Sequence, residues 1–579
     1  MGKQTLIDWK TSMKLRSIAV AWLVMAAGAG AQAEDQVVIA PKRPKLVVVL
    51  SIDQFRGDYI ERFRPWFGKD GFVRLIEEGR YYRNCNYWSG NTVTGPGHAT
   101  LLTGTFAHRN GITGNEWYDE KAGKVLYCVG DATISPLTND GVTKPEGAAA
   151  GEEAGSASPR NLLAGTAGDE LENATNGSAH TLSISNKDRA AVLMGGHAVD
   201  MALWFDGKRG EFVSSAYYGQ QLPEWIRTFN SARHGDAWFK KTWDISAPRD
   251  AYEKLCTVDD FAAESDGGFG AKTFPKTLGA TSEKPDAKYY SNLVTSPYAS
   301  ELLIDAALAG VAAEGLGKDD VPDLLTVSIS STDYIGHAFG PDSWEVMDCA
   351  IKTDATVGRF LKGLDDEVGK GNYSLFVSAD HGVVPLPEAQ QAHHIDAKRV
   401  LERELRGRVE VNLAARFGPP VEGKGYITDT SGFWVRPNRK AFAADSPNAA
   451  KLDQYIAEAY FAQPDVFFAS STSDLLHSTD DTNPLRRALL YAYYPSRCGD
   501  VTYVLKPNYL MSGSTMGTSH GTPWRYDQYV PMLAFGAGIA PGMSEESVTP
   551  PMIGPTVSAL LGVPPPNMCE VGILPGALK

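Results

Sequence analysis

Three apolar runs, each leading to an aspartate, constrain the fold of this chain most strongly. They are residues 46–52 before Asp53, 324–330 before Asp333, and 373–378 before Asp380. Continuous apolar runs bounded by turn residues are typical of parallel strands that helices cover on both faces. Because the carboxyl ends of parallel strands meet at one edge of a sheet, we expect the three carboxylates to lie close together.

Helical patterns alternate with these runs. One has apolar residues at helical spacing from Met347 to Leu364, and another runs from Thr556 to Leu561 and ends at Gly562. A fourth apolar run, 532–535, precedes the second helix. This alternation predicts an α/β fold: an open, mostly parallel sheet flanked by helices, with the functional site at the carboxyl ends of the strands.

The 579 residues exceed what one compact core holds, so substantial insertions are expected. Two less regular blocks, about 115–290 and about 396–505, are interpreted as insertions that cap the sheet edge beside the site. Within the first block, the small residues of 147–158 predict a surface loop, and 206–208 predict the turn of a hairpin. The catalytic domain is then expected to cover 34–579.

The first 33 residues have the pattern of a secretory signal peptide. Lys10, Lys14 and Arg16 are followed by the apolar stretch 17–30 and by a small-residue cleavage site that ends at Ala33. No other run approaches the length of a membrane span. The sequence therefore predicts a periplasmic or secreted protein, cleaved after Ala33.

Charge and cysteine content narrow the environment further. The formal net charge of −14 argues against a nucleic-acid or anionic-membrane partner, which would need a basic face. Six cysteines in an oxidising compartment permit three disulfides, and we expect near neighbours in sequence to pair. Isolated buried thiols are the alternative. The expected pairs are Cys85–Cys128, Cys256–Cys349 and Cys498–Cys569.

Aspartate and histidine side chains cluster at the predicted strand ends in a way that suits metal ions. Any single aspartate there could cap a helix, and any single histidine could be an ordinary buried polar residue. Several together indicate a divalent metal, and mixed Asp/His ligands favour zinc, although manganese or cobalt could substitute. The candidate ligands are Asp53, Asp333, His337, Asp380, His381 and His520.

A Gly-rich segment, Thr94-Gly-Pro-Gly-His98, predicts a tight turn that enters a helix. Backbone N–H groups and the helix dipole favour an anion at such a helix start. A hydroxyl there can act as a nucleophile when a metal holds it as an alkoxide. Thr94 alone could equally be a helix cap, and His98 is expected to pack within the helix.

Taken together, these motifs resemble the alkaline phosphatase superfamily. They are most similar to the phosphate-irrepressible, PafA-type alkaline phosphatases with a threonine nucleophile, which are related to the nucleotide pyrophosphatase/phosphodiesterases. The resemblance spans nearly the whole mature chain. It implies two zinc ions bridged by the reacting phosphate, and a phosphothreonine intermediate. One zinc would take Asp53, Thr94, Asp380 and His381, and the other Asp333, His337 and His520.

Two further matches to the family concern phosphate recognition. Asn115 stands where the family keeps an asparagine that donates to a phosphoryl oxygen, and Lys187 with Arg189 resembles its Lys-x-Arg element. A Lys and a forked Arg complement the extra charge of a monoester. The resemblance thus implies hydrolysis of phosphate monoesters. Asp188 either orients the neighbouring basic pair or has no special role.

Four other functions remain alternatives. A phosphodiesterase or nucleotide pyrophosphatase on the same scaffold is the nearest. A sulfatase would need a modifiable Cys or Ser where Thr94 stands, and a phosphoglycerate-mutase-like enzyme would not carry an export signal. A metal- or phosphate-binding protein without activity is the fourth, and the complete ligand set argues against it.

Overall fold

The computed structural model describes residues 43–143, 156–421, 423–443, 445–478, 480 and 482–579. The predicted signal peptide 1–33 and most of the predicted loop 147–158 lie outside the described residues. The last three residues of that loop, Ser156, Ala157 and Ser158, are described and buried, so for them the prediction of a surface position is wrong. The Ser158 hydroxyl donates to the Asp131 carboxylate, which ties this end of the loop inward.

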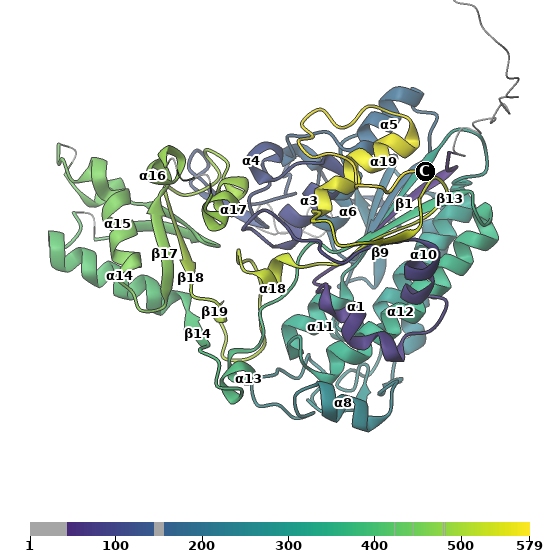
Figure 1. Ribbon diagram of the computed structural model, residues 1–579, viewed down its shortest axis with the longest axis horizontal. Helices are drawn as coiled ribbons and strands as arrows, with labels where there is room; N and C mark the ends of the chain where they lie inside the picture. Colours follow the sequence, from purple (N-terminus) through teal and green to yellow (C-terminus); the bar gives the residue numbers. More distant parts are fainter. Residues whose placement is uncertain (1–42, 144–155, 422, 444, 479, 481) are drawn as a thin grey trace, which may run out of the picture. The chain divides into compact units, whose positions relative to one another are not determined.

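A large mixed sheet forms the centre of the fold (Figure 1). Along the sheet its strands are β21 (Gly542–Ser544), β2 (Arg80–Tyr82), β20 (Met532–Gly536), β13 (Tyr373–Ser378), β1 (Leu46–Ile52), β12 (Asp323–Ile329), β7 (Thr181–Ser185), β8 (Met201–Asp206), β9 (Glu211–Ser215), β5 (Pro136–Thr138) and β6 (Gly141–Val142).

The middle of this sheet is parallel. Strands β13, β1, β12, β7 and β8 pair in parallel, whereas β20 and β9 run antiparallel to their inner neighbours. Every residue of β1, β12 and β13 is buried, as expected for strands covered on both faces. The predicted α/β fold with a mostly parallel sheet is confirmed.

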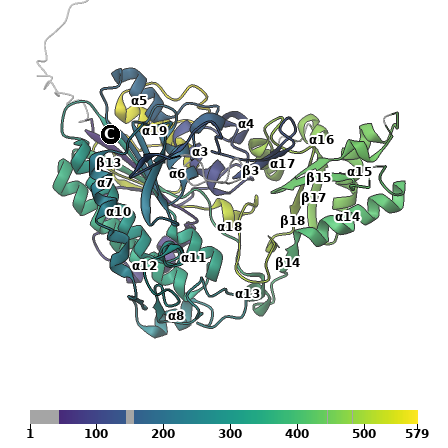
Figure 2. The ribbon, with the colours of Figure 1, turned by 180° about the vertical axis from the view of Figure 1, so that it is seen from behind.

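Helices cover both faces of the sheet (Figures 1 and 2). On one face lie α3 (Thr94–Thr103), α5 (Ala167–Thr175), α6 (Asp188–Gly195) and α19 (Ile553–Leu561); on the other lie α1 (Asp58–Phe63), α10 (Tyr298–Glu314), α11 (Ser331–Phe339) and α12 (Trp344–Leu364). The predicted helix 347–364 is α12. Helix α19 begins three residues earlier than predicted, because Pro555 is tolerated in a first turn, and it ends at Gly562 with φ +75°.

The two blocks that the sequence marks as irregular differ in structure. The first supplies β7, β8 and β9 to the large sheet, with the predicted hairpin turn between β8 and β9, and it also forms the hairpin of β3 (Glu116–Asp119) and β4 (Lys124–Tyr127). The second has its own sheet and apolar core. Its main elements are β15 (Ile427–Ser431), β16 (Trp434–Pro437), β18 (Val501–Leu505), β17 (Val466–Ser471), α14 (Glu402–Phe417) and α15 (Leu452–Phe461).

The predicted disulfides are wrong, because all six cysteines are free thiols. Cys85 and Cys128, one of the expected pairs, are buried in two different apolar clusters, so their nearness in sequence does not bring them together in space. The Sγ of Cys256 instead lies 3.7 Å from the sulfur of Met347. The alternative of isolated thiols is the observed state; four of the six are buried, and Cys256 and Cys569 are partly exposed.

Candidate active site

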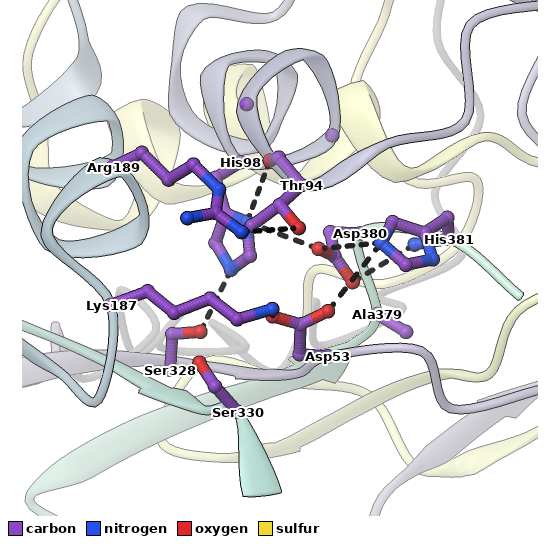
Figure 3. Close-up of polar contacts among 12 residues, drawn as sticks. Asp53, Thr94, His98, Lys187, Arg189, Ser328, Ser330, Ala379, Asp380 and His381 are labelled. Atoms are coloured by element: carbon purple, nitrogen blue, oxygen red, sulfur yellow. Dashed lines mark hydrogen bonds and ion pairs between the residues drawn. The ribbon is translucent and has the colours of Figure 1, made fainter. Parts of the chain in front are cut away.

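Two groups of possible metal ligands lie at the carboxyl ends of the central strands. The first consists of Asp53, Asp380 and His381, whose ligand atoms all lie within 4.8 Å of one another. Asp53 directly follows β1, and Asp380 lies two residues beyond β13, so the parallel pairing of these strands places their carboxylates side by side. All three residues are fully buried. Figure 3 shows them turned toward one another beside Thr94.

The second group consists of Asp333, His337 and His520. Asp333 and His337 are four residues apart on α11 and therefore share one face of the helix, with His337 Nε2 3.2 Å from Asp333 Oδ1. His520 comes from the loop before α18 (Arg525–Gln528), and its Nε2 lies 3.5 Å from the same carboxylate oxygen. The six aspartates and histidines predicted as ligands thus form two neighbouring groups.

The orientation of the three histidines suits metal binding. The Nδ1 atoms of His337, His381 and His520 donate to the backbone carbonyls of residues 518, 382 and 92, at 2.8, 2.8 and 2.9 Å. A neutral imidazole that donates from Nδ1 presents a lone pair at Nε2, which is the usual arrangement behind a metal ligand. Each Nε2 faces the carboxylates of its own group.

Unpartnered buried atoms point to the same conclusion. Asp53 Oδ1, Asp380 Oδ2 and His381 Nε2 are buried and have no hydrogen-bond partner. Leaving such atoms unpaired is costly unless a cation coordinates them. Burial lowers the pKa of His381 to about 3, so its ring is neutral and able to ligate. This donor set fits a divalent metal ion.

The pKa of Asp53 is also consistent with a bound cation. Burial, together with the charges of Asp333 and Asp380, raises the pKa of Asp53 well above its usual value. Several carboxylates confined without water repel one another, and positive charge placed among them relieves that repulsion. The Nζ of Lys187 supplies part of this charge, 2.7 Å from Asp53 Oδ2 and 2.5 Å from Asp333 Oδ2.

Thr94 is the first residue of α3. The cap position belongs to Val93, and the Thr94 side chain makes no capping hydrogen bond, so Thr94 does not act as the helix cap. The buried hydroxyl instead receives a bond from Arg189 Nη2 at 3.4 Å. A Cβ at Gly97 would lie 2.4 Å from the carbonyl oxygen of Asp380, so only glycine lets the start of α3 pack this closely against the end of β13.

The three residues predicted to bind phosphate come from separate elements. Asn115 precedes β3, and its Oδ1 accepts from the Gly95 backbone N–H at 2.7 Å, which leaves its amide N–H groups as donors. Lys187 and Arg189 lie at the start of α6. Arg189 Nε is buried and has no hydrogen-bond partner. The structure thus brings Asn115 and Arg189 to the first turn of α3, and Lys187 to the two ligand groups.

Two residues join the site that the sequence did not mark as functional. His98 is buried on α3 as expected, and its Nδ1 donates to the Thr94 carbonyl at 2.9 Å. The same Nδ1 lies 3.2 Å from Asp380 Oδ2, and Nε2 lies 2.7 Å from Ser328 Oγ (Figure 3). Gln54 donates from its backbone to Asp380 Oδ1 and from Nε2 to Asp333 Oδ1, so it contacts one carboxylate of each group. One indication of this role was present in the sequence, since Gln54 directly follows the candidate ligand Asp53.

Comparison with known proteins identifies the family. Residues 47–524 match the family described as type I phosphodiesterase / nucleotide pyrophosphatase. The chain is 33% identical to alkaline phosphatase PafA of Elizabethkingia meningoseptica over 546 residues, which is 94% of this chain and 96% of that protein. The chain belongs to the PafA-type alkaline phosphatases.

Two more comparisons agree with this assignment. Alkaline phosphatase PhoV of Synechococcus elongatus is 34% identical over 565 residues, covering 95% of this chain and 96% of that protein. The crystal structure of wild-type PafA has a TM-score of 0.84 and 32% identity, and it covers 93% of this chain and 100% of that one. The predicted family and its fold are confirmed.

No helix in the described part of the chain is long and apolar enough to cross a membrane.

Proposed function

We propose that this chain is an exported alkaline phosphatase that hydrolyses phosphate monoesters through a phosphothreonine at Thr94. The observation that carries the proposal is the position of the Thr94 hydroxyl, on the first residue of α3, where Arg189 donates to it. The helix packs through Gly97 against the strand end that carries the Asp380 ligand group. The enzyme is a phosphoric ester hydrolase of the PafA-type family.

The metal ions are proposed to be two zinc ions, one for each ligand group. The first would be held by Asp53, Asp380 and His381 together with Thr94, and the second by Asp333, His337 and His520. Bound zinc supplies the positive charge that favours a deprotonated threonine hydroxyl and a negatively charged leaving oxygen. Carboxylate and imidazole ligands support zinc over calcium or magnesium.

The reaction of the chain itself is a displacement in two steps. Thr94 Oγ attacks phosphorus, a bond between them forms, and the bond from phosphorus to the leaving oxygen breaks. Water then attacks the phosphothreonine, the bond from phosphorus to Thr94 Oγ breaks, and phosphate is released. Thr94 lies at the first turn of α3, where backbone N–H groups favour the anionic oxygens.

Lys187, Arg189 and Asn115 are proposed to hold the non-bridging oxygens. Burial alone would lower the pKa of Lys187, but the carboxylates of Asp333 and Asp53 raise it, so the ammonium stays charged. The unpartnered Nε of Arg189 and the amide of Asn115 remain as donors. Fixed donors of this kind stabilise charge that develops in the transition state.

The second candidate is a phosphodiesterase, favoured by the family description that matches residues 47–524. A diester carries one charge fewer and a second ester group, so it gains less from two cations beside the phosphoryl oxygens. The buried Lys187 and Arg189 therefore support the monoester.

Two assignments outside the site complete the proposal. The signal peptide is placed at 1–33, with a periplasmic or secreted mature protein, because of the charged, apolar and small-residue pattern of the N-terminus. The catalytic domain is placed at 34–579, with insertions at about 115–290 and about 396–505.

The test compares Lys187→Ala and Arg189→Ala with wild type on an aryl phosphate monoester and a bis-aryl phosphate diester. Each loss should lower kcat/KM for the monoester by roughly 10²–10³-fold and affect the diester much less. Lys208→Ala, on the exposed turn between β8 and β9, is the matched control and should match wild type. If both variants keep full activity on the monoester, the proposal is wrong.

A further inference from the structure

The Arg189 guanidinium contacts Tyr127, at the end of the β3–β4 hairpin, as well as Thr94. We propose that Tyr127 is a positioning residue that fixes Arg189 for phosphoryl oxygens and thereby sets the preference for monoesters. The inference rests on the proposed function, in which Arg189 binds the substrate.

The hydrogen bonds around the Tyr127 hydroxyl determine its role. Its one proton is donated to Asp188 Oδ1 at 2.6 Å, and its oxygen accepts from Arg189 Nη1 at 3.3 Å. Burial and the neighbouring carboxylate of Asp188 raise the pKa of Tyr127 well above its usual value, so the phenol stays protonated. The hydroxyl therefore stands between a carboxylate and a guanidinium that are adjacent in sequence.

This arrangement keeps the Asp188 carboxylate away from the Arg189 side chain. Asp188 Oδ1 accepts the Tyr127 proton and the backbone N–H of Arg189, and both bonds occupy the oxygen that could otherwise attract the guanidinium. Without the phenol hydroxyl, that oxygen keeps only the backbone bond and can attract the guanidinium. Arg189 Nη2, now 3.4 Å from Thr94 Oγ1, would then leave the nucleophile.

The same hairpin also anchors Asn115, the neutral phosphate donor. The backbone N–H of Cys128, directly after Tyr127, donates to the carbonyl of Asn115 at 2.8 Å, where the hairpin begins. Asn161 Nδ2 donates to the carbonyl of Cys128 at 3.1 Å and holds this end in place. Tyr127 packs against the apolar cluster that contains Cys128, which limits the freedom of its ring. The two ends of the hairpin thus fix the positions of Asn115 and Arg189 relative to each other.

The experiment measures kcat/KM for an aryl phosphate monoester and a bis-aryl phosphate diester with Tyr127→Phe, Arg189→Ala and the double variant. Tyr127→Phe keeps the ring and removes only the hydroxyl. It should lower kcat/KM for the monoester by about tenfold, the scale of one hydrogen bond to a charged group, and lower the ratio of monoester to diester activity with it. In the Arg189→Ala background, removal of the hydroxyl should cause no further loss.

Tyr118→Phe is the matched control on the same hairpin. The Arg436 guanidinium lies over the Tyr118 ring, 5.8 Å from its centroid. The described hydrogen bonds of the Arg189 side chain go to Tyr127 and Thr94, so Tyr118→Phe should keep the wild-type ratio. Inhibition by inorganic phosphate gives a second measurement, and Tyr127→Phe should weaken it by a similar factor while Tyr118→Phe leaves it unchanged. Thermal melting of each variant checks that it is folded at the assay temperature.

The possible outcomes separate the two proposals. If Arg189→Ala lowers the ratio and Tyr127→Phe does not, or if the two effects add in the double variant, the positioning role of Tyr127 is wrong and the proposed function stands. Equal losses on both substrates from Tyr127→Phe overturn the inference in the same way. If Arg189→Ala itself keeps the wild-type ratio, the monoester assignment fails, and the inference that rests on it fails too.

Discussion

The Nε2 atoms of His337 and His520 lie 3.2 Å apart. Because both rings donate from Nδ1 to backbone carbonyls, in the neutral rings both Nε2 atoms carry lone pairs. Two lone pairs at this distance repel each other, and Asp333 Oδ1 beside them adds negative charge. A cation bound by all three side chains offsets these repulsions, because it attracts both lone pairs and the carboxylate.

The first prediction follows from that pair. His520→Ala removes one of three ligands from the second group, so this variant should lose about one metal ion per chain on dialysis while the first group keeps its ion. Metal analysis by mass spectrometry measures the stoichiometry independently of activity. His477→Ala, an exposed histidine on α16 (Thr472–His477), is the control and should bind the same amount as wild type. Unchanged metal content in His520→Ala would contradict the assignment.

The second prediction concerns the nucleophile. Thr94→Ala should lower turnover by roughly 10⁴–10⁶-fold, as expected for loss of a covalent nucleophile, whereas Thr94→Ser keeps a hydroxyl and should retain measurable activity. Acid quenching during turnover should give a phosphorylated peptide that contains Thr94, detectable by mass spectrometry.

Thr100→Ala is the control for this variant. Thr100 lies on the same helix, and its hydroxyl donates to the Gly97 carbonyl rather than facing the ligand groups. Turnover should persist in this variant and the phosphopeptide should still form. A Thr94→Ala enzyme with near wild-type turnover would show that another group attacks phosphorus.

The third prediction concerns the fit between α3 and β13. In Gly97→Ala the new methyl group would lie 2.4 Å from the Asp380 carbonyl, so backbone must move and the free energy of unfolding should fall by about 1–3 kcal/mol. Activity should fall further than stability, because α3 carries Thr94. Urea unfolding and kcat/KM measure the two effects separately.

Gly407→Ala provides the opposite case. Gly407 lies within α14, and a Cβ there meets no atom within 4 Å, so alanine should stabilise the protein by about 0.5–1 kcal/mol without changing activity. Equal effects of the two substitutions would contradict the packing argument.

Sequence patterns predicted the buried strands in which most residues are apolar. Strands β1 and β13 were predictable because most of their residues are apolar. Strand β7, Thr-Leu-Ser-Ile-Ser, is equally buried, but three of its five residues are polar, so a search for apolar runs misses it. Its Ser183 is satisfied by donating to the Ala191 carbonyl, and it accepts from Thr326 at 2.6 Å, contacts that only the folded chain shows.

The site was predictable where a motif carries the chemistry, and not where one side chain acts on another. The candidate ligands lie just beyond predicted strands or in a Gly-rich loop, so their residue types and positions indicated them. The role of Tyr127 depends on a hairpin that brings it to Arg189 across 62 residues of sequence, and spacing gives no sign of that contact. The disulfide prediction was wrong for a related reason, since distance along the chain does not give distance in space.

The last prediction concerns a buried charge cluster that shares no residue with the candidate site. Lys276 Nζ pairs with Glu345 Oε1 at 2.8 Å, and the nearby Glu264 is almost fully buried, with Oε2 lacking a hydrogen-bond partner. Burial, followed by the charge of Glu345, raises the pKa of Glu264 from 4.5 to about 9. One lysine cannot balance two buried carboxylates, so Glu264 holds its proton in the folded protein.

That raised pKa gives a definite sign to the dependence of stability on pH. Between pH 4.5 and about 9 the folded protein keeps a proton that the unfolded chain releases, so the contribution of Glu264 is complete below pH 4.5 and is lost as the pH rises through this window. Glu264→Gln is neutral throughout. Its free energy of unfolding relative to wild type should therefore increase with pH, by at most about 1.4 kcal/mol per unit. Urea unfolding at several pH values measures this difference, and the exposed Glu253→Gln is the control. A difference that does not vary with pH would show that Glu264 is ionised in the folded protein.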